Sequence, residues 1–209
     1  MVHPVHTRRR PRSARSSDAG FTAIEVLTVA ALVGVLAAFS VPLMGNMLGA
    51  YRLSGDARTL SNELAVAKMR AASLFTQTRL RFNVAARTFQ IENWQKTGTP
   101  AWVAEGEVNK LSSGVSLGYG SVAVAPPNTQ ATIAQAAVCR AADGSTISGT
   151  SCVIFNSRGL PVDYTGAPIG SNAYYLTDGT AVFGNTIAAT GMIRLWRTPA
   201  HTTPTWSLQ

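Results

Sequence analysis

The chain is poor in the residues from which most enzyme sites are built. It has two cysteines and three histidines in 209 residues, and His3 and His6 both precede the first apolar run. No nucleophile elbow, phosphate loop or metal-ligand cluster occurs in the sequence. Asp163 and Asp178 are the best candidates for paired catalytic carboxylates, but both adjoin turn residues, where aspartate commonly bonds to its own backbone. We therefore predict a protein that is not an enzyme and uses no cofactor or metal.

Charged residues are also scarce, at 13% of the chain. The formal net charge is +8, and the five arginines and one aspartate within residues 1–20 supply half of it. A basic composition of this kind is a weak indication of nucleic-acid binding. The length suits one globular domain plus a membrane helix, and the hydrophobic content of 46% allows that domain a real core.

No charged residue lies between Val26 and Tyr51. At about 1.5 Å per residue, a helix over this run is long enough to cross a hydrocarbon core of about 30 Å. A secretory signal has a shorter apolar core followed by a small-residue cleavage site, whereas here the small residue Gly20 precedes the run. We therefore predict a leader at residues 1–20 and a transmembrane helix at 21–44 that stays on the mature protein. The leader arginines favour a cytoplasmic N-terminus, which places the rest of the chain across the membrane.

The join between leader and apolar run resembles that of a type IV prepilin. Its features are a basic leader ending in Gly20, then Phe21, then Glu25 as the fifth residue after the cut, with Pro42 further along the helix. The resemblance implies that a prepilin peptidase cleaves after Gly20 on the cytoplasmic side and methylates the new amino group of Phe21. It also implies that Glu25 guides the subunit into a growing helical filament.

Glu25 distinguishes this interpretation from a plain membrane anchor. A carboxylate inside a bilayer costs about 2.5 to 3.5 kcal/mol on insertion scales and persists only with a partner or a function. The cationic amine at Phe21 of an adjacent subunit would be such a partner. In the alternative, a plain single-pass anchor, Glu25 lies near the membrane interface and favours the N-terminus of its helix.

An amphipathic continuation of the helix is predicted over residues 45–77. Apolar residues recur there at spacings of three, four and seven, which is typical of one buried stripe on a helix. The stripe consists of Leu53, Leu60, Leu64, Ala67, Ala71 and Leu74. Pro42, Gly45, Gly49 and Gly55 weaken this long helix, because proline removes a backbone hydrogen bond and each glycine costs up to about 1 kcal/mol. The predicted break at Pro42 is either a segment that loosens in a filament, as in pilins, or merely a kink.

The hydrophobic period changes to two at Thr78, which predicts an antiparallel β-sheet domain over residues 78–209. A hairpin is expected, with strands at 80–84 and 89–91 around a turn. Further strands are expected at 102–103, 115–117, 153–155, 173–176 and 191–196. Residues 126–151 lack periodicity, which predicts a variable loop. A long helix followed by short strands gives an α+β fold, with the amphipathic half of the helix packed on the sheet.

Cys139 and Cys152 flank a Gly- and Ser-rich stretch in that loop. Pairing is expected in an oxidising periplasm, where closing a loop of this size is worth about 3 kcal/mol in the chain-entropy model. The alternative is two unlinked thiols. A metal site is less favoured, because no other cysteine and no nearby histidine completes a ligand set.

Two later segments resemble the GspH/FimT branch of minor pilins and pseudopilins. They are Val153–Pro161, VIFNSRGLP, and Thr186–Leu195, TIAATGMIRL. The branch has an apolar strand that runs into a turn with glycine, and a last strand that opens with Gly-Arg. The resemblance implies either a minor subunit near the tip of a type IV pilus or a minor pseudopilin of a type II secretion system, and the residues leave both open.

Certain members of this branch bind DNA through a Gly-Arg-any-Arg pattern on the last strand. Gly191 and Arg194 match that pattern here, but Met192 replaces the first arginine. The lost cation removes one phosphate contact and so weakens nonspecific binding. Arg197 beside Trp196 offers a cation next to a stacking surface. In the alternative, which we favour, Trp196 belongs to the packing and the arginines are solvated.

Two functions from different classes follow. The favoured one is a structural subunit of the bacterial inner membrane with a periplasmic C-terminal domain. Such a minor pilin or pseudopilin is processed by prepilin peptidase and joins or primes a filament with other pilins or pseudopilins. The alternative is a membrane-tethered module that binds DNA or a secreted protein without polymerising. A simple tether has no use for a buried carboxylate, so Glu25 favours the first function.

Overall fold

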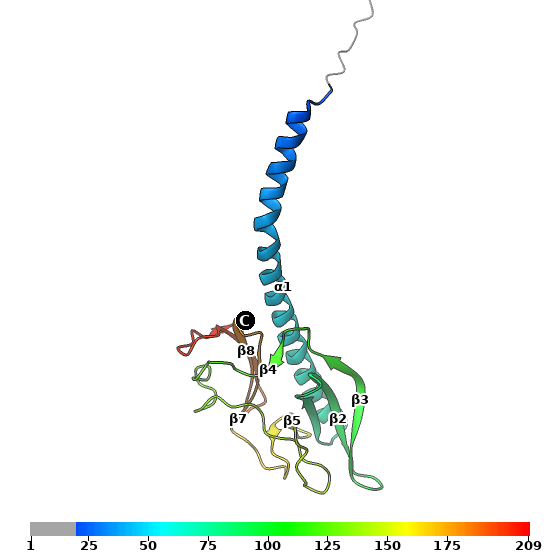
Figure 1. Cartoon of the computed structure of the whole chain (residues 1–209). Coiled ribbons are helices and arrows are strands. Elements are labelled where there is room, and N and C mark those ends of the chain that lie inside the picture. Colours follow the sequence, from blue (N-terminus) through cyan, green and yellow to red (C-terminus); the bar gives the residue numbers. More distant parts are fainter. Residues whose placement is uncertain (1–19) are drawn as a thin grey trace, which may run out of the picture. The chain divides into compact units, whose positions relative to one another are not determined.

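The structure of the protein is a computed structural model that describes residues 20–209, except for the side chains of residues 40–46. The chain forms two compact units, Met1–Met44 and Gly45–Gln209. Of the predicted leader, Gly20 alone belongs to the described residues. Helix α1, Ala23–Ser73, begins in the first unit and ends in the second (Figure 1).

Helix α1 is continuous over its 51 residues. Pro42, where the sequence predicts a break, lies within this helix, and its side chain lies outside the described residues. In the first unit, the described side chains of α1 are exposed throughout. Among the residues that the structure describes, no helix combines the length and the apolarity that crossing a membrane requires.

The C-terminal half of α1 supplies one side of the main core in the second unit. The predicted apolar stripe is buried there, with Leu53, Leu60, Leu64, Ala67 and Ala71 all at most 1% exposed. Ala57 belongs to the same stripe. Leu74 does not, because the helix ends at Ser73 rather than at residue 77, and Leu74 is 48% exposed.

The helix ends in a Schellman motif. The Thr76 N–H donates to the Ala71 carbonyl and the Phe75 N–H donates to the Ala72 carbonyl. This pattern puts Phe75 in the left-handed region, with a φ of +50°. Glycine usually occupies that position, because a side chain makes the conformation unfavourable. The helix end is therefore well bonded but carries an unusual residue.

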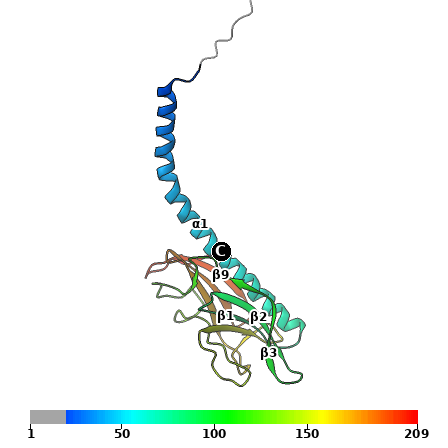
Figure 2. The same cartoon turned by 45° about the vertical axis from the view of Figure 1, so that its right-hand side comes forward.

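Ten strands follow α1 in the described residues and form two antiparallel five-stranded sheets (Figures 1 and 2). Sheet A has the order β3-β2-β1-β5-β6, with strands at Ala101–Lys110, Thr88–Gln95, Thr78–Asn83, Thr150–Phe155 and Pro161–Val162. Sheet B has the order β10-β9-β8-β7-β4, with strands at Ser207–Leu208, Ile193–Pro199, Ala181–Ala188, Ser171–Thr177 and Ser116–Leu117. The α+β class is confirmed, and the predicted antiparallel β-sheet domain contains two sheets.

Individual strands agree with the sequence to different degrees. The predicted hairpin is confirmed, because β1 and β2 pair antiparallel from Thr78 opposite Asn93 to Asn83 opposite Thr88. The start predicted for the strand at 191–196 is wrong, because Gly191 lies in the turn between β8 and β9 with a φ of +75°. That strand is also not the last, since β10 pairs with β9 beyond it. Strands β6, β8 and β10 were not expected from the sequence.

Tyr174 of β7 ties sheet B to sheet A through the core. Its side chain is fully buried, and its one hydroxyl proton is shared between the carbonyl oxygens of Leu80 in β1 and Ser151 in β5, which lie 2.7 and 2.9 Å from the hydroxyl oxygen. Burial raises the pKa of the Tyr174 phenol, so the group stays protonated and remains a donor at neutral pH. The two sheets are therefore joined by a polar contact as well as by apolar packing.

Replacing Tyr174 by Phe should lower the free energy of unfolding by about 1 to 3 kcal/mol, because the buried hydroxyl that bonds to the carbonyl oxygens of both sheet A strands is lost. The measurement is urea unfolding of the full chain in detergent. Tyr164→Phe is the matched control, since Tyr164 is exposed and should leave stability unchanged. Equal stability of Tyr174→Phe and wild type would contradict the proposed contribution of this contact.

Candidate functional site

The predicted processing site lies just ahead of α1. Gly20 and Phe21 precede the helix, both are exposed, and Phe21 has 82% of its surface accessible. The bond between them is outside any helix or strand. Exposed peptide bonds in irregular segments are the ones that proteases cleave most readily. The geometry at this bond is therefore compatible with cleavage.

Glu25 lies in the first turn of α1, three residues after Thr22. The Thr22 hydroxyl accepts a hydrogen bond from the Glu25 N–H at 3.4 Å, and the Thr22 carbonyl accepts from the N–H groups of Glu25 and Val26. Thr-x-x-Glu is the sequence pattern of a capping box, and the bond to the Thr22 hydroxyl is the first of its two reciprocal bonds. A carboxylate in the first turn also interacts favourably with the helix dipole. Sequence reasoning missed Thr22, although Thr-x-x-Glu ahead of an apolar run is a known helix-start signal.

The helix that follows Glu25 is apolar on every side. The large exposed apolar side chains between residues 21 and 39 are Phe21, Ile24, Val26, Leu27, Val29, Leu32, Val33, Val35, Leu36 and Phe39. A helix that is hydrophobic all round is normally found in a protein core or in a membrane. In this structure the apolar side chains of the segment are exposed.

The three candidate DNA-binding residues lie on β9 but do not share one face. Alternate residues of a strand point to opposite faces, so Arg194 and Trp196 lie on one face and Arg197 lies on the other. Trp196 is 9% exposed, and its indole N–H donates to the Thr186 hydroxyl at 3.0 Å. The indole is therefore part of the packing and offers no open stacking surface.

The two arginines of β9 also have different neighbours. Arg194 is exposed beside a pocket of about 260 Å³, and its Nε lies 3.2 Å from the Met192 sulphur. Arg197 has its guanidinium carbon 5.9 Å from the centre of the Phe183 ring. Nonspecific DNA binding depends on several cations that follow one backbone. These residues do not form such a track on β9.

Gly191, which carried the sequence pattern, lies where three elements meet. Its carbonyl oxygen accepts a hydrogen bond from the Lys68 ammonium of α1 at 2.9 Å. A Cβ at Gly191 would lie 2.2 Å from the Gly159 carbonyl oxygen, and a Cβ at Gly159 would lie 2.9 Å from Lys68 Cε. Both segments that resemble the GspH/FimT branch therefore meet on α1. We call the contact of Lys68, Gly159 and Gly191 the glycine junction.

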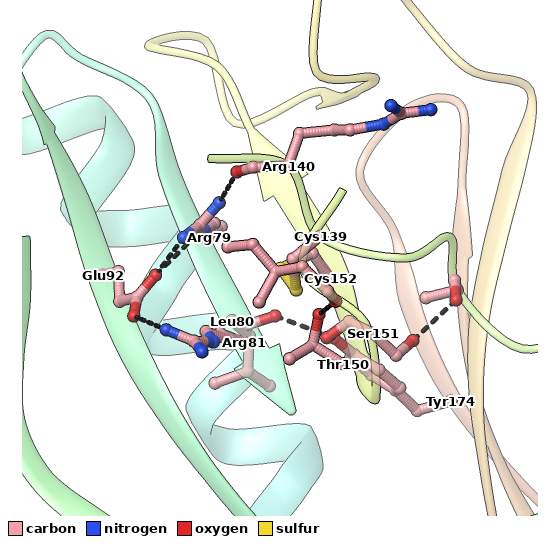
Figure 3. The surroundings of a disulfide bond; sticks show 12 residues. Arg79, Leu80, Arg81, Glu92, Cys139, Arg140, Thr150, Ser151, Cys152 and Tyr174 are labelled. Atoms are coloured by element: carbon pink, nitrogen blue, oxygen red, sulfur yellow. Dashed lines mark hydrogen bonds and ion pairs between the residues drawn. A yellow bond between two sulfur atoms is a disulfide. The ribbon is translucent and has the colours of Figure 1, made fainter. Parts of the chain in front are cut away.

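A disulfide between Cys139 and Cys152 attaches the predicted variable loop to β5. Figure 3 shows a buried ion pair beside it, in which Arg79 contacts Glu92 through Nε at 2.6 Å and Nη2 at 2.5 Å. Arg79 Nη1 donates to the carbonyl oxygen of Arg140, the residue after Cys139, at 2.6 Å. Burial lowers the pKa of Arg79, and the Glu92 carboxylate opposes that effect. The disulfide therefore fixes a carbonyl that helps to satisfy a buried cation.

Asp163 and Asp178 act as turn residues. Hydrogen bonds, chiefly from the Thr165 hydroxyl, hold the pKa of Asp163 below its usual value. Partial burial raises the pKa of Asp178, but hydrogen bonds from the Ala181 N–H and from Thr180 outweigh this effect and lower it. Within residues 20–209, no group of three or more His, Cys, Asp and Glu side chains is placed to hold a metal ion.

Comparison with known proteins gives few matches. No family model matches the chain, and no curated protein matches it. Two solved structures of the minor pseudopilin EpsH from the type II secretion system of Vibrio cholerae are similar, each at 14% sequence identity. The first covers 76% of this chain and 96% of the EpsH chain with a TM-score of 0.36, and the second covers 75% and 96% with a TM-score of 0.43. These values are too low for the likeness to identify a family.

Replacing Gly191 by Ala should destabilise the second unit by more than the usual cost of a side chain at positive φ. Gly114 is the matched control, because it has a similar φ of +86° and open space around its Cβ position, whereas Gly191 faces the Gly159 carbonyl. We expect the free energy of unfolding to fall by about 1 kcal/mol in Gly114→Ala and by about 3 kcal/mol or more in Gly191→Ala, measured by urea unfolding. An equal loss of stability in the two variants would show that the close contact at the glycine junction does not contribute to stability.

Removing the disulfide by Cys139→Ser with Cys152→Ser should lower the free energy of unfolding by about 3 kcal/mol. It should also change the emission of Trp102, because Arg79 lies 4.1 Å over that indole and Arg140 would no longer be fixed beside it. Thiol reductant should bring the wild type to the stability of the double variant and leave the variant unchanged. A variant as stable as the oxidised wild type would contradict this account.

Proposed function

We propose that the protein is a minor pilin or pseudopilin of a type IV pilus or a type II secretion system. It is cleaved after Gly20 by a prepilin peptidase, methylated on the amino group of Phe21, and held at the bacterial inner membrane before it joins or primes a periplasmic filament with other pilins or pseudopilins. The observation that carries the proposal is the segment from Gly20 to Phe39. There, an exposed bond outside any helix leads directly into a capped helix that is apolar on every side.

Cleavage after Gly20 would put a new positive charge next to the capping box. The α-amine of Phe21 would lie one residue before Thr22, at the positive end of the α1 dipole, where a cation is unfavourable. Glu25 in the first turn offsets this charge within the same chain. In a filament, the same carboxylate is also available to the Phe21 amine of a neighbouring subunit. The capping box and the assembly role of Glu25 are therefore compatible.

The second unit provides the part of the subunit that faces away from the bilayer. It has its own core, formed by the stripe of α1 and both sheets, and a disulfide suited to an oxidising compartment. The arrangement of Arg194, Trp196 and Arg197 gives no support to a separate role in DNA binding. In a membrane-tethered module the carboxylate of Glu25 has only its local role at the helix N-terminus, whereas a filament also supplies a cationic partner. The filament subunit is therefore the better supported function.

The proposal predicts a mature chain that starts at N-methylated Phe21. Intact mass and N-terminal sequencing of protein from its own cell should show this species in the wild type and the uncut precursor in Gly20→Trp. Gly20→Ala is a weaker test, because alanine is also small. An uncut wild-type chain would overturn the proposal and leave a membrane tether.

Glu25→Gln extends the same experiment from processing to assembly. The variant should be cleaved normally, because the scissile bond is unchanged, but its share in sheared filaments should fall about tenfold or more. Glu107→Gln is the control, since Glu107 is an exposed glutamate on β3 that should not matter for entry into the filament core. Normal incorporation of Glu25→Gln would remove the role of this carboxylate.

A further inference from the structure

Phe75 combines an unfavourable backbone with an exposed ring. It has a φ of +50°, in a region that bulky L-residues rarely adopt, and 79% of its surface is accessible. A buried ring could offset the unfavourable conformation by its packing, but this ring gains little from the fold. Glycine at this place would complete the same Schellman motif without strain. Neither the backbone nor the packing of the helix end therefore favours phenylalanine over glycine at this position.

An apolar hollow of about 440 Å³ lies beside this ring. Leu74 and Phe75 line it from the end of α1, and Trp94 and Val103 line it from strands β2 and β3. Leu74 and Val103 are 48% and 44% exposed. Exposed apolar groups that gather in one hollow, rather than being scattered singly, are typical of an interaction site. We call this hollow the Phe75 surface.

Strand β3 borders the Phe75 surface and is the outer strand of sheet A. Its C-terminal half has the features that keep edge strands from pairing, namely a register shift around Gly106 and the charges of Glu107 and Lys110. Its N-terminal half, residues 101–104, is AWVA and carries no charge. That stretch of about 13 Å is long enough to pair with a short strand. The unprotected half of the edge is the half next to Phe75.

The charges at the rim indicate the kind of strand that fits. Glu105 is paired with Arg70 at 2.9 Å and also accepts a hydrogen bond from the Asn93 side chain. Lys96 contacts the Phe75 carbonyl oxygen at 3.2 Å and, among the described lining residues, is the cation with no carboxylate partner in an ion pair. An acidic group on the incoming chain would complement it.

We propose that the Phe75 surface binds an extended segment of a partner protein. The segment adds as a strand to residues 101–104 of β3, places an apolar side chain against Phe75 and Val103, and carries an acidic residue next to Lys96. Main-chain hydrogen bonds supply affinity in such strand addition, and the hollow supplies selectivity for alternate side chains. The inference goes beyond filament assembly and does not depend on processing at Gly20.

The test measures binding of two labelled peptides to the full chain in detergent by fluorescence anisotropy. Both peptides have about nine residues with valine and leucine at alternate positions, and they differ only in having aspartate or lysine at both ends. The aspartate peptide should bind, and the lysine peptide should bind at least about tenfold more weakly. Failure of the aspartate peptide to bind at about 1 mM would overturn the proposal.

Phe75→Gly separates a binding role from a structural one. The variant should be as stable as the wild type or more stable, because glycine relieves the positive φ, while its affinity for the aspartate peptide falls at least about tenfold. A loss of stability with unchanged affinity would show that Phe75 serves the fold and would overturn the proposal. Tyr164→Ala, which removes another exposed aromatic side chain, should leave binding unchanged.

Val103→Lys and Val108→Lys form a matched pair on β3. Both valines are exposed, but Val103 lies in the unprotected half and Val108 lies beyond Gly106. Val103→Lys should weaken peptide binding at least about tenfold, and Val108→Lys should leave it unchanged. Equal effects would overturn the assignment to residues 101–104.

Self-association of the wild type that Phe75→Gly abolishes, without peptide binding, would assign the surface to a second copy and overturn the proposed partner.

Discussion

The apolar stripe on the C-terminal half of α1 is the constraint on which the second unit depends, because both sheets bury side chains against it. Sheet A contributes Leu80, Phe82 and Val153 to this core, and sheet B contributes Leu176 and Ile187. The alanines of the stripe allow close approach to the helix backbone. At Ala57 this approach is used directly, since the buried Asn185 side-chain amide of β8 donates to the Ala57 carbonyl at 3.1 Å. One helix therefore positions two sheets through packing and through a polar contact.

The glycine junction is a second contact that holds the β domain on α1. It also gives a structural reason for the glycines on which the sequence resemblance rests. Gly159 and Gly191 are far apart in the chain, yet each lies against the other or against Lys68. In this chain, Gly191 is therefore placed by backbone packing. A Cβ at Gly191 has no space, whereas Arg194 is exposed.

The sequence predicted those features that depend on local periodicity. The stripe of α1 and the β1–β2 hairpin follow from spacings of three to four and of two, and both are present. The division into two sheets could not be predicted, because it depends on β1 pairing with β5, whose residues lie far along the chain. Strand β8 was hidden because it is buried along most of its length and so shows little alternation. Alternation along the strand is enough to place Arg194 and Arg197 on opposite faces, but which strands flank β9 depends on its pairing with β8 and β10.

The start of helix α1 has the residues that helix starts prefer, whereas its end has a residue that helix ends disfavour. Thr22 caps the start through its hydroxyl, and Glu25 lies in the first turn, where a carboxylate interacts favourably with the helix dipole. The proposed assembly role of Glu25 would be additional to this local interaction. At the other end, Phe75 occupies a position suited to glycine and exposes its ring. Departures from local rules without an internal compensation concentrate at functional sites. By this argument the end of α1 is better structural evidence of a binding role than its start, although the start carries the stronger sequence motif.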